Sequence, residues 1–109
     1  QTVDTVTSVR LPDEPLLDNA HVDATAEKFA RIAAELKEKA LILDLSRVRV
    51  IASRGIGEIM ALYNRVDKKL LLCGVTEEIR YLFQIVCLDQ LVGIYETEAD
   101  ALAAARSLA

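Results

Sequence analysis

The stretch ALILDLSRVRVIASRGIGEIM, residues 40–60, contains the features that decide the fold. It opens with a short, nearly continuous apolar run, ALILDL at 40–45, which is typical of a central strand covered on both faces. An irregular link, SRVRVI, follows, and from Ser53 onward the apolar residues recur at helical spacing. The stretch therefore predicts a strand, a link and a helix that is capped by Ser53.

Strand and helix patterns alternate downstream of this stretch. KKLLLCGV, residues 68–75, predicts a second central strand, and Thr76 is placed to cap the helix after it. QLVGIYE, residues 90–96, predicts the last strand, and Thr97 is placed to cap the final helix. Alternation of short apolar strands with helices predicts an α/β fold in which helices pack on a largely parallel sheet.

The residues upstream complete a single domain spanning residues 1–109. TVDTVTSVRL, residues 2–11, is rich in Thr and Val and predicts one strand, which we expect to pair antiparallel at an edge of the sheet. Asp23 is the expected N-cap of the first helix. A chain of 109 residues fits one domain. We therefore expect a mixed, mostly parallel sheet of four to five strands with about four helices.

Composition excludes several classes of function. The net charge is −4 with both signs interspersed, and aromatic residues make up only 5%, so a nucleic-acid surface is not expected. No apolar run approaches the roughly 18 residues that span a bilayer, so direct membrane insertion is not expected either. The two cysteines, Cys73 and Cys87, are too few for a disulfide scaffold. Both are expected to be buried, reduced thiols in a cytoplasmic protein.

The candidate sites lie where strands turn into helices, because ligands of such sheets bind at the carboxyl ends of the strands. Three turns qualify, at 46–55, 74–77 and 95–98, and the first is the most unusual. Gly55 and Gly57 follow Ser53, although each glycine costs a helix up to about 1 kcal/mol relative to alanine. Glycine lets another chain or a phosphate approach the backbone closely. The spacing leaves two interpretations open: Ser53 is a helix cap only, or it is a regulatory phosphorylation site.

The residues do not predict an enzyme. Neither a P-loop nor a dinucleotide-binding motif occurs, so no cofactor is expected. A nucleophile at Ser53 or Cys87 would need a base, and the only histidine, His21, lies in a different segment. One histidine is also a poor signal for a metal site. Asp44 lacks the acidic pair that a phosphoaspartate site requires, and is expected to be a strand-end residue that bonds a nearby loop.

Two segments together resemble the STAS domain of anti-sigma factor antagonists. These are LILDLSRVRVIASRGIGEIMALYNRV and KKLLLCGVTEEIRYLFQIVCLDQLVGIYETEADALAA, and the resemblance covers roughly residues 22–109. The family form is a strand ending in LDLS, a short link, and then DSSGL or DSSGI opening a helix. The resemblance implies a small α/β domain with a mixed sheet and helices mostly on one side. Ser53 aligns with the family serine.

The resemblance also implies a function and its residues. The best-known family members bind an anti-sigma factor that is also a serine protein kinase, and phosphorylation of the family serine ends the binding. By position this implies phosphorylation at Ser53 and a regulatory, bacterial, cytoplasmic protein acting on transcription. Other STAS proteins, or a second copy of the chain, are further partners to consider. The implied partner-binding residues are Ala52, Ser53, Arg54, Gly55, Ile56, Glu58, Thr76 and Glu77.

The chain departs from the family pattern in ways that bear on the switch. Ala52 stands where the family has an aspartate, and Arg54 replaces its second serine. The amino-terminal part shows one strand where the family usually has two, and LPDEPLLDNAHVD, residues 11–23, replaces a shorter turn. These departures leave a second hypothesis, a STAS accessory or scaffold domain without phosphorylation, in a stress-signalling complex or associated with a transporter.

Overall fold

The fold is seen in a computed structural model that describes residues 2–3, 6–11, 22–36 and 40–106. From residue 40 onward, strands and α-helices alternate along the described chain as the hydrophobic pattern predicts. The elements are β1 (Thr2–Val3), β2 (Val6–Arg10), α1 (Val22–Leu36), β3 (Ala40–Asp44), α2 (Ser53–Arg65), β4 (Leu70–Cys73), α3 (Glu77–Ile85), a 3-10 helix (Leu88–Gln90), β5 (Gly93–Tyr95) and α4 (Glu98–Ala105).

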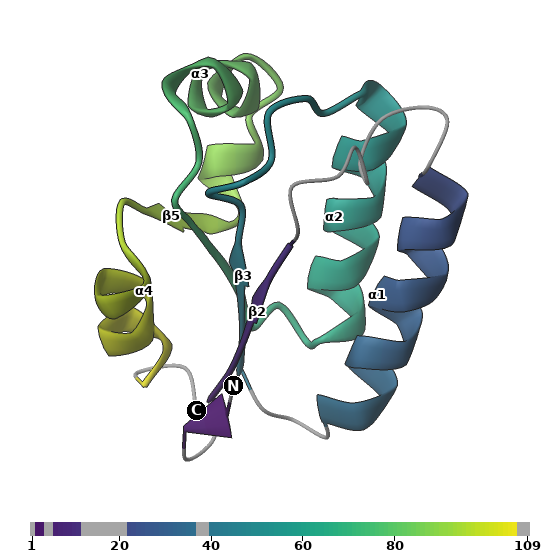
Figure 1. Cartoon of the computed structure of the whole chain (residues 1–109), viewed down its shortest axis with the longest axis vertical. Helices are drawn as coiled ribbons and strands as arrows, with labels where there is room; N and C mark the ends of the chain where they lie inside the picture. The colour runs from purple at the N-terminus through teal and green to yellow at the C-terminus, as the bar shows by residue number, and fades with distance from the viewer. Residues whose placement is uncertain (1, 4–5, 12–21, 37–39, 107–109) are drawn as a thin grey trace.

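The described strands form one five-stranded sheet in the order β1-β2-β3-β4-β5 (Figure 1). β1 pairs antiparallel with β2, whereas β2 to β5 are all parallel to their neighbours. The mixed, mostly parallel sheet is thus confirmed. The prediction of a single strand over residues 2–11 is wrong, because two strands occupy this range and pair with each other. The antiparallel edge strand is β1, and β2 lies inside the sheet, in register with β3 from Val6↔Ala40 onward.

The central strands are buried along their whole length, as continuous apolar runs predict. β4 is shorter than the predicted range 68–75, because Asp67 and Lys68 adopt left-handed backbone angles, φ 56° and 63°, as the chain leaves α2. The last strand is also shorter than predicted. The 3-10 helix takes up the start of the range 90–96, and β5 begins only at Gly93.

Two hydrophobic clusters lie on opposite faces of the sheet. Phe29 of α1, Leu62 of α2 and Phe83 of α3 belong to the larger cluster, so three helices cover one face. Ala101 and Ala105 of α4 belong to the smaller cluster on the other face. Figure 1 shows α4 on the opposite side of the sheet from α1 and α2. The expectation that the helices pack mainly on one side is confirmed.

Threonine caps begin the last two helices. The Thr76 Oγ1 accepts a hydrogen bond from the Ile79 N–H at 3.3 Å, and the Thr97 Oγ1 accepts one from the Asp100 N–H at 3.1 Å. Both cap predictions are confirmed. The prediction for Asp23 is wrong, because α1 begins at Val22 and Asp23 lies in its first turn. A carboxylate there still favours the helix through the positive end of the dipole.

The two cysteines occupy different environments. Cys73 ends β4 and is buried; burial and the nearby Asp44 carboxylate raise the pKa of its thiol to about 12. Cys87 is exposed, so the prediction of two buried thiols is wrong for this residue. The reason is that α3 ends at Ile85, and Cys87 lies in the left-handed turn beyond its apolar face, at φ 61°. None of the described helices combines the length and apolarity needed to cross a membrane.

Candidate functional site

Ser53 occupies the first helical position of α2 and not the N-cap position that the sequence predicted. The N-cap is Ala52, whose backbone carbonyl accepts from the Ile56 N–H at 3.1 Å, and Ser53 is the first helical residue. Ala52 makes no side-chain cap hydrogen bond, and the prediction of Ser53 as the cap is wrong because Ser53 is already helical. Ser53 is exposed, and its hydroxyl has no hydrogen-bond partner in the described part of the chain. The hydroxyl is therefore accessible and not needed to hold the helix.

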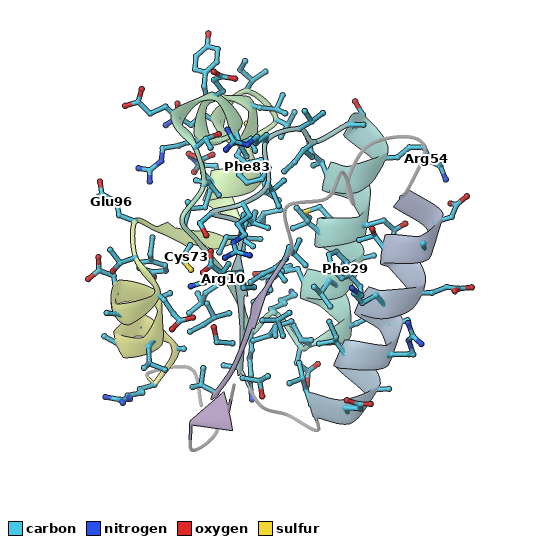
Figure 2. The ribbon with its side chains drawn as sticks, in the orientation of Figure 1. Arg10, Phe29, Arg54, Cys73, Phe83 and Glu96 are labelled. Carbon is cyan, nitrogen blue, oxygen red and sulfur yellow. The ribbon has the colours of Figure 1, made fainter. Side chains whose placement is uncertain are left out.

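Arg54 connects the starts of two helices. Its Nη2 donates to the Asp23 Oδ1 at 2.6 Å, which joins the first turn of α2 to the first turn of α1. Figure 2 shows the Arg54 side chain at the end of the molecule where both helices begin. The two side chains are 58% and 88% exposed, so the pair contributes little to stability. Its effect is to link the starts of α1 and α2 at the residue that directly follows Ser53.

The two glycines after Ser53 have different environments. Gly55 is buried. Gly57 is exposed, and a Cβ added to it would meet nothing within 4 Å. Gly57 comes four positions after Ser53, so both lie on one face of the helix. Packing within the chain therefore does not require a glycine at this position, and the surface over it is open.

The neighbouring predicted residues divide between surface and core. Ile56 is partly buried and packs against the larger hydrophobic cluster, and Glu58 is half-buried. Glu77 is exposed, whereas the half-buried Thr76 uses its hydroxyl to cap α3. The residues at the start of α2 and those at the start of α3 all lie at the carboxyl ends of the parallel strands, since α2 follows β3 and α3 follows β4. Figure 1 shows α3 and the start of α2 at the same end of the sheet.

Asp44 organises this edge of the sheet. Its side chain is almost fully buried; Oδ2 accepts from the Arg10 Nε at 3.0 Å, and Oδ1 accepts from the Ser46 N–H at 2.9 Å. Burial alone would raise the pKa of Asp44, but the Ser46 hydrogen bonds and the Arg10 guanidinium outweigh it and lower that pKa. The expectation that Asp44 bonds a nearby loop is confirmed. The bond holds the beginning of the link that leads to α2.

Gly74 allows the next turn to pass close to this carboxylate. Its φ is +71°, a backbone conformation that residues with a side chain rarely adopt. A Cβ there would lie 3.0 Å from the Ser46 Cβ and 3.1 Å from the Asp44 Oδ1. The turns after β3 and β4 therefore pack directly against each other.

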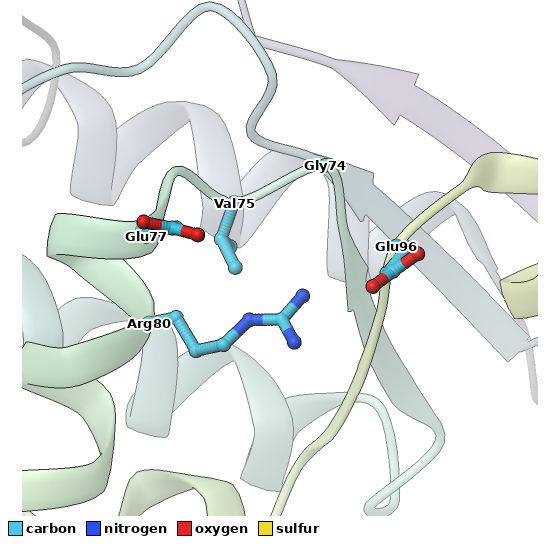
Figure 3. Close-up of a pocket in the computed structure, with 5 residues that line it drawn as sticks. All are labelled: Gly74, Val75, Glu77, Arg80 and Glu96. Carbon is cyan, nitrogen blue, oxygen red and sulfur yellow. The ribbon is translucent and has the colours of Figure 1, made fainter.

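A pocket of about 310 Å³ opens beside the turn after β4. It is lined by Gly74, Val75, Glu77, Arg80 and Glu96 (Figure 3). The sequence placed Glu77 at a site and named the turn 95–98 as a candidate without singling out Glu96, whereas Arg80 was missed. Arg80 and Glu96 come from α3 and from the turn after β5, and no local pattern indicates that these two charges share a pocket. Within the described ranges, no group of three or more His, Cys, Asp or Glu residues could hold a metal ion.

Solved structures resemble this fold. A STAS domain protein described as an anti-sigma-factor antagonist, from Planctomyces limnophilus, superposes with a TM-score of 0.84 at 22% identity, covering 96% of this chain and 95% of that one. A protein from Thermotoga maritima described as an anti-sigma factor antagonist gives 0.84 at 23% identity, covering 97% and 92%. A sulfate transporter family protein from Wolinella succinogenes gives 0.77 at 20% identity, covering 99% and 91%.

These likenesses show the fold, and the sequence itself identifies the family. A search of curated proteins finds no match. The family model of the STAS domain, however, matches residues 1–101, which is nearly the whole chain. Together with the mixed five-stranded sheet, this match shows that the chain belongs to the STAS domain family.

Proposed function

We propose that this chain is a regulatory protein-binding domain of the anti-sigma factor antagonist type. In this proposal it binds an anti-sigma factor that is also a serine protein kinase, and phosphorylation of Ser53 ends the binding. It acts in the bacterial cytoplasm on transcription and is not an enzyme. The observation that carries the proposal is the exposed hydroxyl of Ser53 at the first position of α2, which makes no hydrogen bond to any residue that the structure describes.

A phosphoryl group at this position changes the surface more than the fold. It adds a charge of about −1.5 to −2 at the positive end of the helix dipole, beside backbone N–H groups that have no partner within the helix. Because the Ser53 hydroxyl caps nothing, its modification breaks no hydrogen bond of the described structure. The phosphoryl group would also add negative charge one residue before Arg54, which pairs with Asp23, and would alter the charge that a partner meets.

The proposed binding surface consists of exposed or half-buried residues at the two helix starts. We define the α2–α3 surface by Ala52, Ser53, Arg54, Gly57, Glu58, Thr76 and Glu77. Gly57 was not among the residues implied by the resemblance, and it is included because the space over it is open. Gly55 and Ile56 contribute from beneath, as a buried glycine and a residue packed on the core.

One experiment tests both the binding and the switch. The protein is purified from its own organism with phosphatases blocked, and the phosphorylation sites are mapped by mass spectrometry. A kinase that copurifies is then titrated against wild type, Ser53→Asp and Ser53→Ala. We expect phosphate on Ser53, tight binding of wild type and Ser53→Ala, and weak binding of Ser53→Asp. Equal affinity for all three proteins would refute the switch.

A second function is a STAS scaffold or accessory domain that binds its partner without phosphorylation. Ala52 favours it, since the acidic residue that precedes the family serine is missing here. The fold is also found in a sulfate transporter family protein. This alternative predicts a stable complex that responds to neither Ser53→Asp nor growth conditions, with a well-covered, unmodified Ser53 peptide.

A further inference from the structure

The pocket between the turns after β4 and β5 contains charged side chains that form no ion pair with any described residue. Arg80 extends its guanidinium from α3 into the pocket, and Figure 3 shows the Glu96 carboxylate facing it from the opposite wall. Among described residues, no ion pair or hydrogen bond involves the side chain of Arg80, Glu96 or Glu77. One cation and two carboxylates thus line a concave site without forming an ion pair with each other.

This charge arrangement restricts the chemistry of a ligand. A simple anion would meet Arg80 but also two carboxylates, and a simple cation would meet the carboxylates but also a guanidinium. A molecule with a carboxylate and an ammonium group can pair with both kinds of charge, because its carboxylate can accept charge-assisted hydrogen bonds from Arg80 and its ammonium group can donate them to a pocket carboxylate. Val75 and the aliphatic part of Arg80 supply apolar surface between them.

The size of the pocket agrees with a small molecule. Its volume of about 310 Å³ lies at the lower end of the range for small-molecule sites. That is about ten times the volume of a water molecule in the liquid, which is room for a molecule of amino-acid size. The location also fits, since ligands of parallel sheets bind outside the carboxyl ends of the strands.

We propose that this pocket binds a free α-amino acid, with the carboxylate on Arg80 and the ammonium group on Glu96, and with Glu77 on the other side of the guanidinium. The site is distinct from Ser53 and supplies the domain with a small-molecule input. Binding would tie the turn after β4 to the turn after β5. Glu77 also belongs to the α2–α3 surface, so an occupied pocket changes the charge presented at one end of that surface.

Nuclear magnetic resonance titration of the ¹⁵N-labelled chain tests the proposal without a protein partner, so its outcome is independent of the proposed function. The probes are L-serine and L-glutamine, together with two analogues of glutamine: glutaramate, which lacks the ammonium group, and 4-aminobutanamide, which lacks the carboxylate. We expect saturable shifts of the Gly74, Val75 and Glu96 amides with an amino acid, at a Kd on the order of 1 mM or below. Both analogues should bind at least about tenfold more weakly.

Matched variants locate the two ends of the ligand. Arg80→Gln and Glu96→Gln should each weaken amino-acid binding at least about tenfold. Arg65→Gln and Glu35→Gln, at exposed positions on α2 and α1, should leave it unchanged. The proposal is overturned if neither amino acid shifts the pocket amides, if glutaramate binds as tightly as glutamine, or if the control variants lose binding equally. The same spectra report whether each variant is folded.

Discussion

Replacing Gly57 with alanine should stabilise the free protein by about 1 kcal/mol, because alanine is the better helix former by that amount. The structure supports the full gain, since Gly57 lies inside α2, is exposed, and a Cβ there meets nothing within 4 Å. For a domain of this length, 1 kcal/mol raises the melting temperature by about 4 °C or more. Urea unfolding followed by circular dichroism should show a higher midpoint with an unchanged slope.

The same substitution separates stability from partner binding. If a partner chain lies against the open surface over Gly57, the added methyl group should weaken that complex while the free protein becomes more stable. Gly74→Ala is the matched contrast, because its φ of +71° and the Ser46 Cβ at 3.0 Å leave no room for a side chain. That variant should lose at least about 1 kcal/mol. A Gly57→Ala protein less stable than wild type would refute the assignment of an open helix surface.

Three further predictions concern single residues. Thr76→Ala should destabilise the protein by about 1 kcal/mol through loss of the α3 cap, measured by urea unfolding. The pKa of Asp44 is lowered from 3.8 in the folded state, so its contribution to stability is present above that value and is lost as the pH falls through the lowered pKa; Asp44→Asn should flatten this acid limb in thermal melts. A thiol reagent should modify Cys87 in the folded protein and leave Cys73 unmodified, because Cys73 is buried and its thiol has a pKa of about 12. Equal labelling of both cysteines by mass spectrometry would contradict this.

The strands and helices could be predicted because their signals are local. The continuous apolar run at 40–45 by itself indicates a buried strand, and β3 is buried along its length. The helical spacing of apolar residues likewise indicates which face of each helix packs on the core. The caps at Thr76 and Thr97 were also predictable, since each needs only a hydroxyl and an N–H three residues later. Recognition of the family followed from the same ordered succession of strands and helices, and the match over residues 1–101 confirms it.

The surroundings of the candidate sites depended on contacts between distant segments. The backbone geometry at Ala52 made Ser53 the first helical residue instead of the cap, and a chain turn after α3 left Cys87 exposed. The Arg54–Asp23 pair spans 31 positions in the sequence. Sequence determined the elements because short-range free energies select them. Only the tertiary structure decided which charges meet at the carboxyl edge of the sheet, because electrostatic contact depends on distance in space.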